Sequence, residues 1–151
     1  MKLITYTIEK VIDNLEELKV ITKLHYKESA PYDDIPLNIN WDLYLRLDKG
    51  KALKLYVMRK KGLLIGYAVF FVSASFEYST SIQASLNNIY LHPKHRGTGL
   101  KFISWCDDQL KELGVQVVYH HVKARNDYGK LLKRIGYVTM NIEYSKRLDK
   151  R

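Results

Sequence analysis

The residues best suited to chemistry lie in segment 92–101, where two glycines follow a basic residue. Gly97 and Gly99 flank Thr98 and follow Arg96, and a helical pattern of apolar residues begins directly after them. The first turn of a helix has backbone amides without intrahelical partners and the positive end of the helix dipole. Glycines let an anion approach such amides without a Cβ in the way. The segment therefore predicts a phosphate-binding turn, to which Arg96 adds positive charge.

Two common phosphate loops do not fit this segment. The P-loop requires Gly-Lys followed by Ser or Thr, which the segment lacks. The dinucleotide-binding fingerprint requires a third glycine, where this chain has Phe102. The third option is a loop that holds the pyrophosphate of an acyl-coenzyme A.

At these residues the sequence resembles the GNAT acetyltransferase superfamily. The family signature Arg/Gln-x-x-Gly-x-Gly/Ala is matched by residues 96–101 except at the last position, which is Lys101. The runs 90–93 (Tyr-Leu-His-Pro) and 131–137 (Leu-Leu-Lys-Arg-Ile-Gly-Tyr) are also similar to the family, and the resemblance covers about residues 53–148.

A narrower resemblance is to acetyltransferase-like proteins encoded by tailed bacteriophages. It is carried by residues 120–129 and by the run Tyr144-Ser-Lys-Arg-Leu148. It implies a phage-encoded enzyme in the host cytoplasm. It leaves open a catalytically inactive phage accessory or virion-associated module with the same fold.

The family resemblance implies a site for acetyl-CoA and an amine acceptor, either a small molecule or a protein lysine or N-terminus. Amides of residues 96–101 would hold the pyrophosphate, and the Leu91 backbone would pair with the pantetheine like an added strand. The Lys101 ammonium would either contact the phosphates or point away from them. The cofactor-binding residues implied in this way are Leu91, Arg96, Gly97, Thr98, Gly99, Leu100, Lys101 and Asn126.

Acetyl transfer requires a neutral amine, and a lysine-like amine has a pKa of about 10.4. An imidazole titrates near neutrality and suits the role of general base. His120 and His121 are the candidates, on an expected strand over 115–122. Adjacent strand residues point to opposite faces, so at most one of them would face the thioester.

The leaving thiolate can take a proton from a general acid. Many family members carry a tyrosine at the position that is Leu132 in this chain. Tyr128 and Tyr144 are the alternative candidates, against ordinary packing of an abundant residue type. Asn87 and Asn88 lie on the central strand where relatives often carry a carboxylate, and an amide would need a water relay to accept a proton.

Three carboxylates are candidates for binding a cationic acceptor, the alternative being an ordinary solvated loop. They are expected between the first two helices: Glu28, Asp33 and Asp34. No metal-ligand spacing occurs, so we expect no metal. Cys106 falls on an apolar helical stripe with Leu100, Ile103, Leu110 and Leu113, and we expect it to be buried.

The elements that must position these residues follow from apolar periodicity and from turn residues. They predict a mixed α/β sheet in the order β-α-α-β-β-β-α-β-α-β, with a right-handed crossover between parallel strands. The family resemblance implies that these two strands splay and that the thioester lies in the splay. In residues 53–58, Leu53, Leu55 and Val57 alternate with the other side chains, which predicts a half-buried strand. Asn38 or Asn40 is predicted to cap the second helix. The predicted strands are 2–9, 53–58, 63–72, 82–91, 115–122 and 137–148, and the predicted helices are 11–27, 41–47, 100–113 and a short one from the cap Asn126 to Gly136.

Composition limits the remaining choices. A chain of 151 residues with 46% hydrophobic residues predicts one domain over residues 1–151. The single cysteine and the lack of a signal-peptide or membrane-spanning apolar run predict a cytoplasmic protein without a membrane partner. The net charge is +9, and seven of these charges lie in residues 92–151. This suits a phosphorylated ligand, while no nucleic-acid motif accompanies it. The sequence does not decide whether the chain forms a homodimer.

Overall fold

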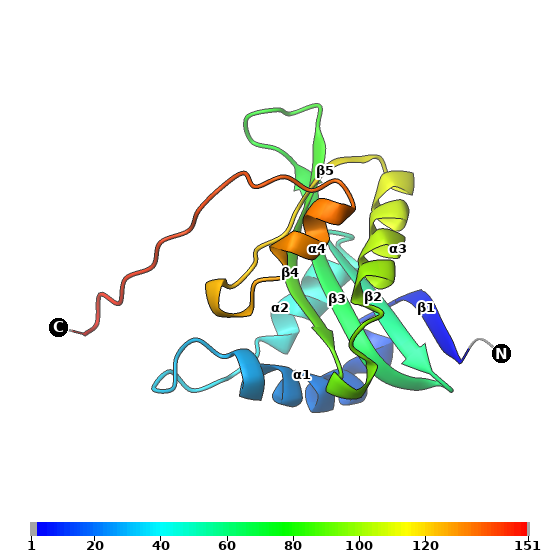
Figure 1. The fold of residues 1–151 in the computed structure, drawn as a ribbon, viewed down its shortest axis with the longest axis vertical. Helices are drawn as coiled ribbons and strands as arrows, with labels where there is room; N and C mark the ends of the chain where they lie inside the picture. Colours follow the sequence, from blue (N-terminus) through cyan, green and yellow to red (C-terminus); the bar gives the residue numbers. More distant parts are fainter. Residues whose placement is uncertain (1–2, 151) are drawn as a thin grey trace. The chain divides into compact units, whose positions relative to one another are not determined.

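The computed structural model describes residues 3–150 in two compact units, one ending at His121 and one beginning at Val122. The first unit is a five-stranded sheet in the order β1-β2-β3-β4-β5 (Figure 1). Neighbouring strands are antiparallel except β4 and β5, which are parallel, so the predicted mixed sheet is confirmed. The strands are β1 (Ile4–Glu9), β2 (Leu53–Lys60), β3 (Leu63–Ala74), β4 (Ile82–Leu91) and β5 (Val115–Tyr119); the α-helices are α1 (Leu15–Ser29), α2 (Trp41–Lys49) and α3 (Gly99–Glu112).

The sheet separates two apolar cores. On β2, Tyr56 and Met58 pack in one core with Phe102 and Cys106 of α3. Leu53, Leu55 and Val57 pack in the other core, with Leu18 and Ile21 of α1. The prediction of a half-buried β2 was wrong, because helices cover both faces of the sheet. Cys106 is fully buried, as predicted.

The helices begin and end largely where the sequence places them. Asn40 caps α2, because its Oδ1 accepts the Leu43 N–H at 3.0 Å. Gly114 follows α3 with a φ of +85°, a conformation that favours glycine. The predicted helix over 11–27 is a 3₁₀ turn, η1 (Ile12–Asn14), followed by α1. On α3, Phe102 is buried and Leu113 is 46% exposed, so the stripe is shifted from the prediction. Residue 2 of the predicted first strand lies outside the described residues.

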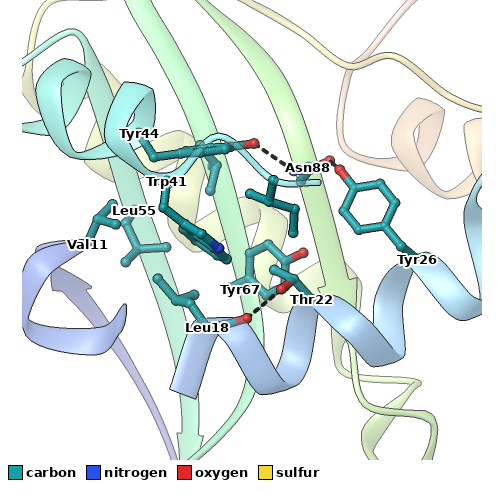
Figure 2. A pocket seen from close by; sticks show the side chains of 11 residues that line it. Val11, Leu18, Thr22, Tyr26, Trp41, Tyr44, Leu55, Tyr67 and Asn88 are labelled. Carbon is teal, nitrogen blue, oxygen red and sulfur yellow. Dashed lines mark hydrogen bonds between the residues drawn. The ribbon is translucent and has the colours of Figure 1, made fainter. Parts of the chain in front are cut away.

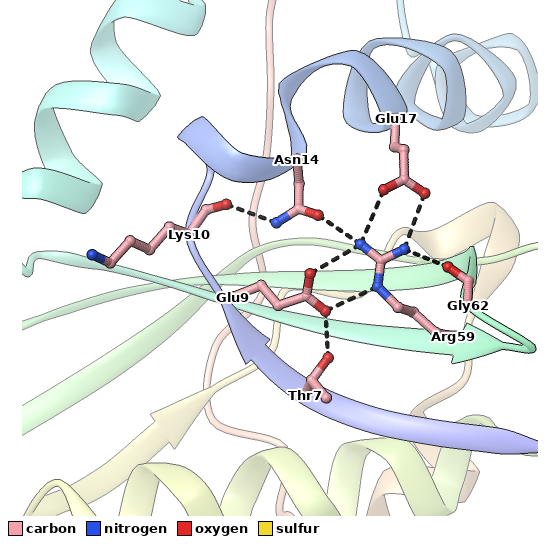
Figure 3. A network of polar contacts seen from close by, with 7 residues as sticks. All are labelled: Thr7, Glu9, Lys10, Asn14, Glu17, Arg59 and Gly62. Carbon is pink, nitrogen blue, oxygen red and sulfur yellow. Dashed lines mark hydrogen bonds and ion pairs between the residues drawn. The ribbon is translucent and has the colours of Figure 1, made fainter.

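Arg59 joins the start of the chain to the β2–β3 hairpin (Figure 3). Its guanidinium donates to Glu9 Oε1 at 2.9 Å, to Glu17 Oε2 at 3.0 Å and to Asn14 Oδ1 at 2.6 Å. It also donates to the Gly62 carbonyl at 2.8 Å. These contacts fix β1, η1 and the start of α1 against one strand.

The parallel pair separates partway along its length. Pairing runs from Ile82 with Val115 to Ser85 with Tyr119, where β5 ends. The predicted strand over 115–122 was therefore too long, and His120 and His121 lie beyond it. From Leu86 to Leu91, β4 keeps β3 on one edge and has no described strand on the other. The predicted splay is present.

The second unit contains a 3₁₀ turn, η3 (Ala124–Asn126), and one short helix, α4 (Gly129–Arg134). Gly136 follows α4 with a φ of +99°, as expected for a helix end. The prediction of Asn126 as the cap was wrong, because α4 begins after Tyr128. Instead, Asp127 Oδ1 accepts the Gly129 N–H at 2.7 Å, which continues the turn into the helix.

The predicted last strand over 137–148 is not formed in the described residues. Its alternating apolar side chains are exposed, from 68% for Met140 to 89% for Tyr144. The error has a physical source: alternation shows that a segment could be a strand, but a strand also needs the edge of a partner. Among residues 3–150, no helix is both long and apolar enough to cross a membrane.

Candidate active site

A β-bulge in β4 sets the geometry of the site. Val69 pairs with Asn88 and Phe70 pairs with Leu86, so Asn87 is an extra residue. Before the bulge, Leu86 faces the core under α3. After it, Asn88 and Tyr90 face the side of α1 and α2. The bulge therefore moves Asn88 onto the same face as Asn87, which a regular strand would prevent.

The two asparagines meet the hydroxyl of Tyr44 on α2. Asn87 Nδ2 donates to Tyr44 Oη at 2.7 Å, and Asn88 Nδ2 donates to it at 3.3 Å. Tyr26 of α1 donates to Asn88 Oδ1 at 3.0 Å (Figure 2). Burial, with Tyr26 nearby, raises the pKa of Tyr44 despite the opposing effect of the amides. The phenol therefore keeps its proton at neutral pH.

Sequence reasoning identified the asparagines but missed Tyr26 and Tyr44. The available signal was weak: two adjacent polar residues, Asn87 and Asn88, break the alternation of apolar and polar residues that begins at Ile82. Their partners come from separate helices, and no spacing rule connects these helices to β4.

The phosphate-binding turn predicted from the sequence is open in the structure. A 3₁₀ turn, η2 (Pro93–His95), leads to Gly97, whose φ is +106°. The Phe102 N–H donates to the Thr98 carbonyl at 3.2 Å. The amides of Gly99, Leu100 and Lys101 come before this donor in the first turn of α3. Helix geometry gives these amides no intrahelical acceptor. A Cβ on Gly97 would meet no atom within 4 Å. The turn thus fits an anionic group.

The two glycines differ in what they require. The positive φ of Gly97 is strained for any other residue. At Gly99, an added Cβ would lie 3.7 Å from Leu91 Cδ2, an ordinary contact. Gly97 is therefore the position at which the turn needs glycine.

The Leu91 backbone faces the open edge of β4. The His92 N–H donates to the Ile65 carbonyl of β3 at 2.7 Å. Because alternate residues of an antiparallel strand point to opposite edges, the amide and carbonyl of Leu91 point away from β3. This edge is the one that β5 leaves, so it can accept an added strand or an extended ligand.

Arg96 links this edge to α1. Its Nε donates to the Leu91 carbonyl at 3.2 Å, and its Nη2 lies 2.6 Å from Glu28 Oε2. Its guanidinium carbon lies 5.7 Å from the centre of the Tyr90 ring. Glu28 thus lies on the last turn of α1 and pairs with Arg96, rather than standing in the α1–α2 loop as expected. Asp33 and Asp34 are in that loop and are exposed.

The other predicted cofactor-binding residues differ in position. The Thr98 hydroxyl donates to the His95 carbonyl at 3.0 Å and so belongs to the turn itself. Leu100 is half-buried and Lys101 is exposed on the first turn of α3. Asn126 lies in the second unit.

The predicted acid and base residues have contrasting environments. His120 is half-buried with its ring 5.8 Å from that of Phe70, and burial, followed by the nearby His121, lowers its pKa to about 4. His121 is exposed. Burial raises the pKa of Tyr128 to about 12, so this phenol keeps its proton at neutral pH. Tyr144 is 89% exposed. Tyr128 and Tyr144 belong to the second unit.

Comparison with known proteins supports the fold. No protein-family model matches the sequence, and no curated protein matches it. Among solved structures, the ribosomal-protein-alanine N-acetyltransferase of Brucella melitensis biovar Abortus 2308 has a TM-score of 0.71 at 17% identity, covering 96% of this chain and 99% of that one. The chain has the GNAT acetyltransferase fold.

Two further structures with this fold show how varied its members are. An aminoglycoside acetyltransferase from an uncultured soil metagenomic sample has a TM-score of 0.70 at 12% identity, covering 96% of this chain and 97% of that one. A predicted acetyltransferase from Clostridium acetobutylicum, solved with acetyl-CoA, has a TM-score of 0.69 at 15% identity, covering 96% of both chains. The GNAT fold is therefore established, and any activity of this chain has to be argued from its own site.

Proposed function

We propose that this chain transfers an acetyl group from acetyl-CoA to a primary amine. The observation that carries the proposal is the open amide turn at the start of α3, which adjoins the unpaired edge of β4 through Arg96 and Leu91. A pyrophosphate and an extended pantetheine need these two features side by side. The Clostridium acetobutylicum protein with the same fold was solved with acetyl-CoA.

In this proposal, the amides of residues 96–101 hold the pyrophosphate, and the Leu91 backbone pairs with the pantetheine. Arg96 and Lys101 supply positive charge, and Thr98 and Leu100 complete the turn. A contact between Asn126 and the cofactor stays a prediction. Arg96 would exchange its pair with Glu28 for a phosphate, or would hold Glu28 beside the bound ligand.

The reaction proceeds by direct attack. The neutral amine nitrogen attacks the thioester carbonyl carbon and forms the C–N bond. The C–S bond then breaks, coenzyme A leaves as a thiolate, and the nitrogen loses one proton. The products are an N-acetyl amide and, after protonation of the thiolate, coenzyme A.

The acid and base remain the candidates named from the sequence. Tyr128 or Tyr144 would protonate the thiolate. A pKa of about 12 keeps Tyr128 protonated at neutral pH but makes it a weaker acid than an ordinary tyrosine. His120 or His121 would accept the amine proton. A pKa of about 4 makes His120 a weak base, which favours His121 or a water for this step.

Acetyl-CoA titration by calorimetry tests the proposal, with Gly97→Val and a matched control, Gly62→Val. Both glycines have positive φ and open space at Cβ, so the two variants carry similar backbone strain. Of these two glycines, only Gly97 lies in the proposed phosphate-binding turn before α3, whereas Gly62 lies between β2 and β3. We expect wild type and Gly62→Val to bind alike and Gly97→Val to bind at least about tenfold more weakly. Absence of binding at millimolar acetyl-CoA would refute the proposal.

A catalytically inactive module is the second candidate. It is favoured by Leu132, which occupies the usual acid position and is 5% exposed. Incubating host lysate with isotopically labelled acetyl-CoA separates the candidates, because transfer to any protein or small amine rejects the inactive module. The phage origin implied by residues 120–129 stays a prediction.

A further inference from the structure

Arg96 makes contacts on three sides at the corner where β4 ends. Its Nε donates to the Leu91 carbonyl at 3.2 Å, and its guanidinium carbon lies 5.7 Å from the centre of the Tyr90 ring. Its Nη2 lies 2.6 Å from Oε2 of Glu28, on the last turn of α1. The basic side chain beside the proposed phosphate-binding turn is therefore already paired with an anion of the protein itself.

The packing of α1 on β4 fixes the position of Glu28 relative to Arg96. His25, three residues before Glu28, is 8% exposed, and its ring stacks on Tyr90 with 4.9 Å between the ring centres. His25 Nδ1 also lies 2.6 Å from the Tyr67 hydroxyl of β3. Because residues three apart are neighbours on one side of a helix, this buried contact turns Glu28 toward the end of β4.

The ion pair itself can exchange. The side chains of Arg96 and Glu28 are 50% and 42% exposed, so water reaches both partners. Exposed pairs of this kind contribute little to stability, because water competes for both charges. A carboxylate released from the pair would be hydrated rather than buried without a partner. Arg96 can thus leave Glu28 for a ligand anion, provided that the anion makes the stronger contact.

A diphosphate meets that condition. Arg96 directly precedes Gly97, so its side chain starts at the edge of the turn whose amides would bind the same ligand. A diphosphate carries more negative charge than a carboxylate, and a guanidinium can donate two parallel N–H groups to one phosphate. An uncharged ligand gives Arg96 no such contact. A ligand with a single carboxylate supplies only what Glu28 already supplies.

We propose that Glu28 sets the selectivity of the turn by competing with the ligand for Arg96. This inference rests on the proposed function. A ligand with a diphosphate replaces Glu28 on the guanidinium, whereas a ligand without one leaves the pair intact and gains nothing from Arg96. Glu28 thus determines specificity without touching the diphosphate: its carboxylate lowers the affinity for every anion and so excludes the weakly bound ones.

A double-mutant cycle tests this competition. Acetyl-CoA is titrated by calorimetry into the full chain and into Glu28→Gln, Arg96→Met and the variant that combines both. We expect Glu28→Gln to bind acetyl-CoA about threefold more tightly than wild type, and the same substitution to change nothing in the Arg96→Met chain. Simple repulsion between Glu28 and the ligand would instead act in both chains.

Two controls isolate the pair. Asp33→Asn removes an equal charge from the exposed α1–α2 loop and should leave the affinity for acetyl-CoA within about twofold of wild type. S-Acetylpantetheine, which lacks the diphosphate, should bind to Glu28→Gln and to wild type alike. Thermal melts of all variants check that they fold.

The outcomes separate this inference from the proposed function. If acetyl-CoA binds but Glu28→Gln does not tighten its binding, or tightens it equally in the Arg96→Met chain, the inference fails and the proposed function stands. Tighter binding of S-acetylpantetheine to Glu28→Gln also overturns the inference. Inorganic pyrophosphate is the second probe. If it binds with the expected dependence on Glu28 while acetyl-CoA does not bind, the proposed function fails and the inference stands. If neither binds, both are wrong.

Discussion

At the scale of single residues, Tyr56 carries a polar atom that the fold does not use. Its side chain is fully buried between the sheet and α3, and its hydroxyl has no hydrogen-bond partner in the described part of the chain. Burial raises its pKa. A buried hydroxyl without a partner loses its hydrogen bonds to water and gains none within the protein, which lowers the stability of the fold.

We therefore expect Tyr56→Phe to raise the free energy of unfolding by about 1 kcal/mol, measured by urea denaturation. Tyr67→Phe is the matched control, because the Tyr67 hydroxyl lies 2.6 Å from His25 Nδ1 and its loss should destabilise. A destabilised Tyr56→Phe variant would show that this hydroxyl has a bonding role.

At the scale of elements, Arg59 holds four segments together. Its side chain is 15% exposed and contacts Glu9, at 22%, and Glu17, at 44%. The Arg59 hydrogen bond is the largest cause of the lowered pKa of Glu9. Removing the cation leaves partly buried carboxylates without their partner, which costs more than the pair contributes.

We expect Arg59→Met to lower the free energy of unfolding by about 2–4 kcal/mol, measured by chemical denaturation. Lys19→Met removes an exposed pair with Glu16, in which the side chains are 43% and 90% exposed, and should cost under about 0.5 kcal/mol. Equal losses in the two variants would contradict the special role of Arg59.

The bulge at Asn87 acts at the same scale. One extra residue turns the end of β4 so that two adjacent asparagines face α1 and α2, while Leu91 faces the core under α3. The facing of the asparagines toward α1 and α2, and of Leu91 toward α3, thus depends on a local irregularity in one strand.

At the scale of the whole molecule, His120 couples stability to pH. Its pKa is about 4 in the folded chain and about 6.5 in an unfolded one. As the pH falls below 6.5, the unfolded chain binds the proton first, so stability declines until about pH 4. The loss amounts to about 2–3 kcal/mol between pH 7 and pH 4.

We expect His120→Gln to reduce this dependence, measured as unfolding free energy against pH. His121→Gln is the control, since that side chain is exposed. An unchanged slope between pH 6.5 and pH 4 in His120→Gln would show that another group titrates there.

The sequence by itself determined the elements whose signals are local. The strand Ile82–Leu91, the cap Asn40, the helix end at Gly114 and the glycine turn before α3 all appear as predicted. Periodicity, capping and turn chemistry act over a few residues, so such features can be deduced from neighbours in the chain.

Only the tertiary structure decided what distant segments do to one another. Alternation over 137–148 could not supply a partner edge, and the pattern of β2 could not show that helices cover both faces. The pairing of Arg96 with Glu28 joins residues far apart in the chain, as do the contacts of Asn87 and Asn88 with Tyr44. Side chains so separated meet only when the packed sheet and helices fix their directions, and no local pattern encodes that geometry.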